Sequence, residues 1–209
     1  MPARKRAQIS TRKQPQQARS NDLVQAILEA AVRVLEKEGA QHFTTARVAA
    51  KAGVSVGSVY QYFPNKAAIL FRLQSDEWRE NTAMMRAILQ DRATPPFDRL
   101  RKLVHPFVKS ECDEAAVRIA LNDAAPLYRD APEAAEAKGE WDSVADAFMR
   151  EVLPGRPKAV RDLASDIVTT TLGTVGKEFS EEPRTPAEIR TYADAMADMF
   201  CAYLKSLQR

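Results

Sequence analysis

The sequence contains few of the residues that build metal centres, redox sites and catalytic triads. Its 209 residues include only two cysteines and two histidines. Cys112 and Cys201 lie far apart, without the short spacing of a metal site, which is typical of buried, reduced thiols in a cytoplasmic protein. His42 and His105 likewise belong to no metal-like or triad-like arrangement. We therefore expect no metal and no cofactor, and an enzyme is disfavoured.

Long apolar runs are missing as well. No stretch approaches the roughly 20 residues that cross a bilayer. The basic, polar N-terminus has no apolar segment of the kind found in secretory signals. We expect no membrane partner and a cytoplasmic location. The hydrophobic fraction of 45% is that of a globular chain, and the length suits one domain of ordinary size plus a smaller one.

Acidic residues are scarce in the N-terminal third. Residues 1–66 hold 11 Lys and Arg against 4 Asp and Glu, a net charge of +7. Residues 67–209 hold 20 against 24, a net charge of −4. A basic N-terminal part on an acidic body is typical of a protein that binds a polyanion. Chance clustering of charge on a solvated surface is the alternative.

The first 20 residues carry six of these basic side chains and no acidic one. Glutamine and proline fill much of the remainder, so no packed structure is predicted for residues 1–20. Such a basic disordered arm can follow DNA phosphates or enter a minor groove, and it can equally be a solvated tail.

Residues 44–66, TTARVAAKAGVSVGSVYQYFPNK, have the spacing of a helix-turn-helix, whose second helix enters the major groove of DNA. Ala49 is small where the second helix must pass closely. Gly53 follows at the turn, where a left-handed backbone favours glycine. Val59 then faces inward from the second helix. The whole spacing, with the aromatic run that ends it before Pro64, is more specific than an Ala–Gly pair alone.

Apolar residues recur at helical spacing through the rest of the chain, without strand-like alternation or a glycine-rich loop. Ser20 or Asn21 can cap the first helix, Gly39 marks its end, and Asn65 can cap a long fourth helix. The predicted helices cover residues 20–39, 45–52, 55–63, 66–90, 97–110, 113–128, a stretch bracketed by Pro132 and Pro154, 157–181 and 186–208. We predict an all-α fold in which the arm (1–20) precedes a helix-turn-helix DNA-binding domain (21–66) and a helical body (67–209).

The segments AAVRVLEKEG and FTTARVAAKAGVSVGSVYQYFPNKAAIL resemble the TetR family of bacterial transcriptional regulators. The resemblance covers residues 22–70, about a quarter of the chain. It implies a three-helix head on a divergent, all-helical, ligand-binding body that dimerises through its last two helices. For this chain it implies about nine helices, an effector-binding and dimerisation domain at 67–209, and a homodimer interface on 157–181 and 186–208.

The resemblance also implies which residues contact double-stranded operator DNA. They are Thr44, Thr45, Ser55, Val56, Gly57, Ser58, Tyr60, Gln61, Tyr62 and Lys66. Of these, Thr44, Thr45, Tyr62 and Lys66 resemble the family's phosphate clamp, because hydroxyls, helix N-termini and a cation suit phosphate oxygens.

The remaining six lie on the recognition helix, which the family places at Val54 to Phe63. There Gln61 can pair with adenine N6 and N7, and the serine hydroxyls can bond bases or phosphates. Gly57 leaves room for the backbone to approach the duplex. Tyr60 can contact a thymine methyl or a phosphate, and packing inside the head is its alternative.

One position departs from the family's pattern. Position 46, after the two threonines, often carries an arginine in the family, but this sequence has Ala46. Arg47 next to it points roughly 100° away around a helix. Operator reading is therefore expected to rest more on Gln61 and on DNA shape.

In the body, the resemblance implies a small-molecule effector whose binding rotates the heads apart and releases DNA. Candidate pocket residues are large or amphipathic side chains, with ordinary core packing as the alternative for each. They are Trp78, Met85, His105, Phe107, Asn122, Tyr128, Trp141 and Phe148. Near the end of the chain, Gly173, Thr174 and Gly176 either let helices approach closely or mark a kink.

Together these features predict a transcriptional repressor whose dimer binds a palindromic operator and is released by an effector. An architectural or effector-independent DNA-binding protein and a transcriptional activator are the alternatives. An enzyme is a more distant one, because the acidic cluster of Glu111, Asp113 and Glu114 near Cys112 is better explained as solvated charge at a helix end. The protein is expected in the bacterial cytoplasm, associated with the nucleoid.

Overall fold

The computed structural model describes residues 18–124 and 132–209, so the predicted arm lies almost wholly outside the described residues. Contacts between Cα atoms divide the chain into two compact units. The head unit combines Met1–Trp78 with Ala116–Ala135, and the body unit combines Arg79–Ala115 with Glu136–Arg209. The domain boundary predicted at residue 66 divides the chain by function, whereas the two compact units divide it by contacts. The predicted boundary therefore stays a prediction.

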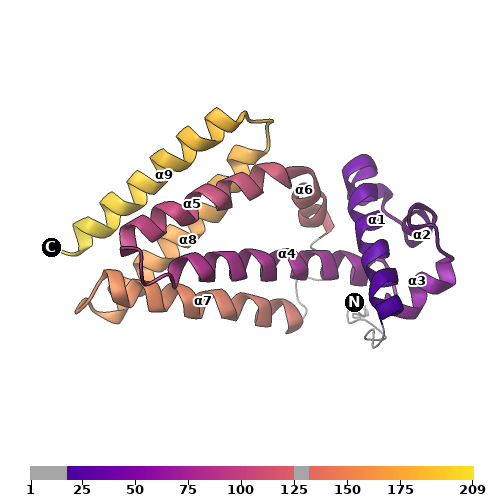
Figure 1. Cartoon of the computed structure of the whole chain (residues 1–209), viewed down its shortest axis with the longest axis horizontal. Coiled ribbons are helices and arrows are strands. Elements are labelled where there is room, and N and C mark those ends of the chain that lie inside the picture. The colour runs from indigo at the N-terminus through magenta and orange to yellow at the C-terminus, as the bar shows by residue number, and fades with distance from the viewer. Residues whose placement is uncertain (1–17, 125–131) are drawn as a thin grey trace, which may run out of the picture. The chain divides into compact units, whose positions relative to one another are not determined.

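Every regular element in the two described ranges is an α-helix (Figure 1). The helices are α1 (Ala18–His42), α2 (Thr45–Ala52), α3 (Val56–Tyr62), α4 (Lys66–Leu89), α5 (Pro96–Asp113), α6 (Ala115–Ala124), α7 (Pro132–Val152), α8 (Lys158–Ser180) and α9 (Pro186–Leu207). The prediction of an all-α fold with about nine helices is confirmed.

Glycines with positive φ set the two turns that shape the start of the head unit. Gly39 adopts φ 70° and ψ 172° and interrupts α1 at the predicted place. Gly53 adopts φ 70° and ψ 28° after α2, and its N–H donates to the Ala50 carbonyl at 3.3 Å. The next N–H, of Val54, donates to Ala49 at 3.0 Å. Because side chains disfavour this left-handed conformation, glycine is the residue that fits between α2 and α3.

The core of the head unit holds helices that are too short to persist alone. Ile27, Phe43, Val59 and Phe63 are completely buried there. Helices of eight and seven residues, as α2 and α3 are, gain little stability from their own hydrogen bonds. Their packing against α1 and the first half of α4 therefore fixes the position of α3.

Helix α6 belongs to the head unit although α5, before it in the chain, belongs to the body unit. Its Ala120 and Leu121 are buried in the same core as α1, α2 and α3. Arg118 Nε lies 2.9 Å from Oε1 of Glu77 in α4, and both side chains are mostly buried. Burial lowers the pKa of Arg118, while the Glu77 charge opposes that shift. Sequence patterning did not predict that α6 packs in the head unit.

In the body unit, α5 lies against both α8 and α9, and their facing side chains form the core (Figure 1). Gly176 lets α8 approach α5, because a Cβ there would meet Phe107 Cε1 at 3.2 Å and Glu111 Cγ at 3.4 Å. A Cβ at Gly173 would meet nothing within 4 Å. The sequence left two interpretations of these small residues, close helix approach or a kink. At Gly176 the structure shows close helix approach.

One side of α8 is apolar without being buried. Ala164, Val168 and Leu172 are buried, whereas Leu163 and Ile167 of the same helix are exposed. The apolar surface of α8 is therefore wider than the core of the body unit requires.

A buried arginine joins three helices of the body unit. Arg99 in α5 is only 1% exposed, and it donates to the carbonyl of Leu89 at the end of α4. It also forms an ion pair with Glu151 of α7, and Arg92 reaches the other oxygen of that carboxylate at 2.8 Å. The Arg99 guanidinium carbon lies 5.7 Å from the centroid of the Phe148 ring. Arg99 thus ties α4, α5 and α7 together.

The cysteines are free thiols. Cys201 is buried, as predicted, and Cys112 is half-buried; burial raises the pKa of both thiols. No helix within the described ranges is long and apolar enough to span a membrane. The same residues contain no group of three or more His, Cys, Asp or Glu arranged to hold a metal ion.

Candidate functional site

Two capping side chains fix where the helices of the turn begin. Thr44 precedes α2 with an extended backbone, and its Oγ1 accepts from the Arg47 N–H at 3.2 Å. Ser55 precedes α3 in the same way, and its Oγ accepts from the Ser58 N–H at 3.0 Å. The first N–H groups of a helix have no partner inside the helix, so these bonds stabilise both helix starts. The result is a helix-turn-helix over the residues that the sequence predicted.

The two serines of α3 are also bonded to each other. Ser55 Oγ lies 2.8 Å from Ser58 Oγ, and Ser58 is only half exposed. Both hydroxyls therefore have partners within the head unit. The sequence alone gave them a role toward DNA and did not show this internal one.

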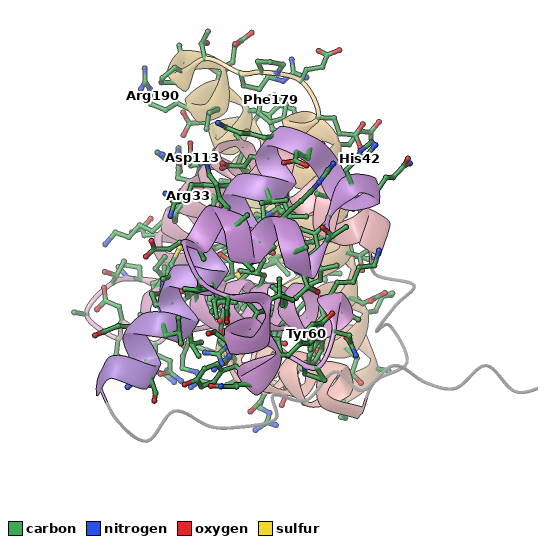
Figure 2. The ribbon with its side chains drawn as sticks, turned by 90° about the vertical axis from the view of Figure 1, so that its right-hand side faces the viewer. Arg33, His42, Tyr60, Asp113, Phe179 and Arg190 are labelled. Carbon is green, nitrogen blue, oxygen red and sulfur yellow. The ribbon has the colours of Figure 1, made fainter. Side chains whose placement is uncertain are left out.

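The outward side of α3 carries four of the predicted contact residues. Val56 and Tyr60 are 39% and 44% exposed, and Gly57 and Gln61 are exposed beside them. Val56 and Tyr60 are four residues apart, as are Gly57 and Gln61, so these two pairs lie on neighbouring strips of one helix face. In Figure 2, Tyr60 is labelled on α3, on the side of the head unit that faces the viewer. Its exposure separates Tyr60 from the packed aromatics of the head.

The four residues of the predicted phosphate clamp differ in exposure. Thr44 and Lys66 are exposed, whereas Thr45 is buried and Tyr62, at 5% exposure, packs in the core of the head unit. The Asn65 side chain accepts from the Ala68 N–H at 3.0 Å and so caps α4, with Lys66 at the first helical position. Of these four residues, Thr44 and Lys66 are the two that are accessible to solvent.

Arg47 is engaged inside the head unit. It forms an ion pair with Glu38 of α1 and donates to the His42 carbonyl at 3.1 Å. These contacts tie the end of α1 to α2, while Ala46 beside Arg47 is exposed. Arg47 therefore does not stand in for the arginine that the family often carries at position 46.

The body unit contains a small cavity of about 20 Å³, room for about one water molecule. Its walls come from α4, α5, α7 and α8. They are Leu89, Leu100, Leu103, Trp141, Ala145, Phe148, Met149, Val168, Thr169 and Leu172. All of these side chains except Thr169 are apolar, so the walls favour an apolar occupant.

Two of the eight predicted pocket residues, Trp141 and Phe148, line this cavity. Met85 and Phe107 are buried in the same core without lining it. His105 lies on α5 with its Nε2 3.0 Å from Asp194 Oδ1 of α9, away from the cavity walls.

None of the described contacts places the other three predicted pocket residues at the cavity. Trp78 belongs to the head unit. Tyr128 lies outside the described residues, as does the side chain of Asn122.

Comparison with known families covers most of the chain. Residues 27–73 match the family described as "Bacterial regulatory proteins, tetR family". Residues 95–207, more than half of the chain, match "Tetracyclin repressor-like, C-terminal domain". This chain belongs to the TetR family. TetR-family membership makes it a DNA-binding transcriptional regulator with a helix-turn-helix, and it extends the resemblance from the head to the body.

Solved structures share the fold of this TetR-family chain. A putative transcriptional regulator from Pseudomonas aeruginosa PAO1 superposes with a TM-score of 0.70 at 17% identity, covering 90% of this chain and 94% of the other. The fatty acid degradation regulator FadR from Bacillus halodurans gives a TM-score of 0.68 at 19% identity, with 90% and 96% covered. At these identities the likeness shows the fold alone.

Curated relatives of this TetR-family chain match over a shorter stretch. Nucleoid occlusion factor SlmA from Yersinia enterocolitica and from Yersinia pestis is 40% identical over 81 residues, 37% of this chain and 39% of SlmA. The chain therefore spans well under half the length of the curated relatives it matches.

Proposed function

We propose that this TetR-family chain is a repressor whose homodimer binds a palindromic operator and releases it when a small-molecule effector binds the body. The observation that supports this most is the outward face of α3, where Val56, Gly57, Tyr60 and Gln61 are exposed together. A recognition helix of this kind reads base edges in the major groove. Acting on the chromosome, such a repressor works in the cytoplasm at the nucleoid.

In this proposal, base reading and phosphate binding fall to different residues. Gln61 is suited to adenine, because its amide accepts from N6 and donates to N7. The Thr44 hydroxyl already accepts from the Arg47 N–H, and it keeps its own proton to donate to a phosphate oxygen. Lys66 adds a full positive charge at the start of α4.

Replacing Lys66 by alanine tests the phosphate contact. Lys66 is exposed, so its charge can neutralise a phosphate without reading a base. Operator and non-operator DNA should lose affinity by a similar factor, and the slope of log K against log salt should fall by about 1 for each head. Fluorescence anisotropy titrations at several salt concentrations measure both. A changed base preference at a single operator position would contradict this role.

Replacing Gly57 by alanine separates protein stability from DNA binding. A Cβ at position 57 would meet only Ser55 Oγ, at 3.6 Å, an ordinary contact. Alanine is about 0.5–1 kcal/mol better than glycine inside a helix, so the melting temperature should stay the same or rise. Operator affinity should fall, because the new methyl occupies space that the duplex needs. Unchanged affinity by anisotropy would show that the backbone at Gly57 stays clear of DNA.

The proposed dimer interface is the exposed apolar side of α8 together with α9. Leu163 and Ile167 of α8 and Met199 of α9 are large apolar side chains left in solvent. Exposed apolar surface of this kind is typical of a face that a partner covers. A second copy is the partner that a palindromic operator requires, since each half-site needs a head.

The proposed effector is uncharged and largely apolar, because the cavity walls offer almost no polar side chain. A drug-sized ligand needs roughly 300–1,000 Å³. The cavity is far smaller, so the effector must prefer a state in which the walls have moved apart. Helix α4 contributes Leu89 to the cavity wall and Lys66 to the head unit. An effector that displaces α4 at the cavity would therefore also move Lys66. Related folds have been solved as FadR from Bacillus subtilis with stearoyl-CoA and as SmeT with triclosan.

Selection of genomic DNA fragments by the purified protein tests the proposed function. The bound fragments should share an inverted repeat, and a reporter gene behind it should be expressed more when the regulator is absent. Uncharged apolar compounds are then titrated onto the operator complex. A Leu172→Phe variant, which fills the cavity, should keep its operator affinity and lose the response. Fragments without a common sequence, bound in proportion to their length, would contradict the proposal.

The name of the curated relatives favours a second candidate, DNA binding without an effector. SlmA is called a nucleoid occlusion factor, and the small cavity of this chain is compatible with a body that takes no ligand. The same titration decides between the two. Release of the operator by one compound, abolished by Leu172→Phe, would exclude the second candidate.

A further inference from the structure

The walls of the body cavity carry two side chains that can form hydrogen bonds. Trp141 of α7 has an indole N–H on an otherwise apolar ring, and Thr169 of α8 has a hydroxyl. Both side chains are half-buried. The remaining walls are aliphatic, phenyl and thioether side chains, which have no hydrogen to donate. A hydrogen bond that a wall side chain donates to an occupant therefore comes from Trp141 or Thr169.

The fold itself does not use the hydrogen-bonding groups of Trp141 and Thr169. Among the residues that the structure describes, neither side chain has a hydrogen-bonding partner. Other helical hydroxyls in the body unit do have one: Ser110, Ser180 and Ser206 each donate to the carbonyl three residues earlier, at 2.9, 2.7 and 2.7 Å. Buried polar groups in folded proteins normally have partners. Trp141 and Thr169 are therefore available to an occupant of the cavity.

The size of the cavity brings the two groups to one position. Its volume of about 20 Å³ holds about one water-sized group, so an oxygen atom in it lies close to both side chains. The indole N–H can only donate, and the hydroxyl can donate as well. A carbonyl oxygen accepts two hydrogen bonds and brings no proton that would need an acceptor of its own. A carbonyl is therefore the polar group that matches these walls.

An anionic oxygen fits the cavity less well, because none of the described residues that line it is a lysine, arginine or histidine. Burying a carboxylate without a cation costs far more free energy than burying a neutral carbonyl. Arg99, whose guanidinium carbon lies 5.7 Å from the ring centroid of the wall residue Phe148, is already paired with Glu151. The walls thus favour a neutral ligand.

We propose that Trp141 and Thr169 donate hydrogen bonds to one carbonyl oxygen of the effector, so that the ligand is an uncharged ketone, aldehyde or ester with an apolar body. This inference rests on the proposed effector binding and adds the polar group that selects the ligand. The apolar body of the ligand needs the wider cavity of the effector-bound state, whereas its oxygen needs only the space already present. The two side chains are then the residues that determine effector specificity.

Thr169→Val removes the hydroxyl and keeps the shape of the side chain. It should raise the Kd of a ketone about 5-fold, which is one net hydrogen bond of about 1 kcal/mol converted at 25 °C. An alkene in which CH₂ replaces the carbonyl oxygen should bind the variant and the wild type within about 2-fold of each other, because it has no bond to lose. Trp141→Phe also removes wall area, so it should weaken both probes, and the ketone about 5-fold more than the alkene.

The test measures direct binding to the full-length protein by equilibrium dialysis, which does not depend on tryptophan fluorescence. The probes are alkyl phenyl ketones from acetophenone to hexanophenone, each paired with its alkene, so that apolar bodies of several lengths are compared. Far-UV circular dichroism confirms that each variant is folded.

Thr170→Val is the matched control. Thr170 is exposed beside Thr169, its hydroxyl donates to Asp166 Oδ1 at 3.4 Å, and it does not line the cavity. The control should leave the Kd values of both probes unchanged. Thr169→Ser should keep the ketone affinity, because it keeps the hydroxyl.

A selective loss of ketone affinity in Thr169→Val and Trp141→Phe supports the inference. Binding of no ketone in the series at millimolar concentration overturns it, as does an equal loss for ketone and alkene, which would make the two residues apolar walls only.

Anisotropy with the selected operator tests the proposed function separately. Ketone binding with the expected selectivity but without operator release would support the carbonyl contact and contradict the proposed effector response. Release of the operator by a ketone and its alkene alike, unaffected by Thr169→Val, would support that response and overturn the carbonyl contact.

Discussion

Replacing Glu151 by leucine is expected to lower the free energy of unfolding of the body unit by about 3–5 kcal/mol, because it leaves a buried cation without its carboxylate. Arg99 is 1% exposed, and after the change its charge would face the Leu89 carbonyl instead of an anion. Water cannot reach the guanidinium to replace the lost partner. The cost is therefore the desolvation of an unpaired charge, which exceeds what the ion pair itself contributes.

The opposite substitution should cost less. Arg99→Met leaves Glu151 24% exposed and still bonded to Arg92 at 2.8 Å, so that carboxylate keeps both water and a cation. We expect a loss of about 2 kcal/mol, chiefly from the Leu89 carbonyl that loses its donor. The double variant, Arg99→Met with Glu151→Leu, should lie within about 1.5 kcal/mol of the wild type, because apolar side chains of similar volume replace the whole pair.

Urea unfolding followed by Trp141 fluorescence measures these values. A Trp78→Phe background keeps the signal in the body unit, since Trp78 belongs to the head unit. Arg92→Met is the matched control, because Arg92 contacts the same carboxylate with a side chain that is 71% exposed. Its effect should stay within about 1 kcal/mol. Equal losses for Glu151→Leu and Arg99→Met would show that the difference in burial does not govern this pair.

Helix boundaries were predictable because local chemistry determines them. Gly39 and Gly53 adopt positive φ where helices end or break, and Asn65 caps α4 through the Ala68 N–H. Such signals depend on a few neighbouring residues and need no knowledge of the fold. The all-α class followed for the same reason, because helical periodicity is also local.

The partners of the helices were not predictable in the same way. Leu163 and Ile167 belong to the apolar stripe of α8, but they are exposed, while the smaller Ala164 is completely buried. Hydrophobicity ranks Leu163 and Ile167 above Ala164, whereas burial follows the side of α8 that faces the core, which depends on tertiary packing. The docking of α6 in the head unit escaped prediction similarly, since an apolar stripe does not say which core it enters.

In the candidate site too, the features set by local sequence were predictable and those set by tertiary contacts were not. The sequence placed Val56, Tyr60 and Gln61 on one recognition helix, and the structure exposes all three. It did not show that Ser55 and Ser58 bond each other, because side-chain hydrogen bonds depend on coordinates. The cavity walls are mostly aliphatic side chains such as Leu89 and Leu172, which have no sequence signature apart from that of a core.

Replacing Ile167 by aspartate is expected to make the protein monomeric at micromolar concentration and to weaken operator binding by about 10³-fold or more. Ile167 lies one turn after Leu163 on the exposed apolar side of α8. In the proposed dimer, two-fold symmetry would put two carboxylates into an apolar contact, where each loses its hydration. A single head would then bind DNA with roughly the affinity of non-specific binding.

Ala147→Asp is the matched control, because Ala147 is exposed on α7, outside the proposed interface. It should stay dimeric with an unchanged Kd, whereas Met199→Asp on α9 should repeat the result of Ile167→Asp. Sedimentation gives the mass and anisotropy gives the Kd at the same protein concentration. A dimeric Ile167→Asp variant would move the interface away from α8, and a monomer with full operator affinity would remove the need for two heads. A monomer with weak binding would explain why α8 keeps large apolar residues that its own core does not bury.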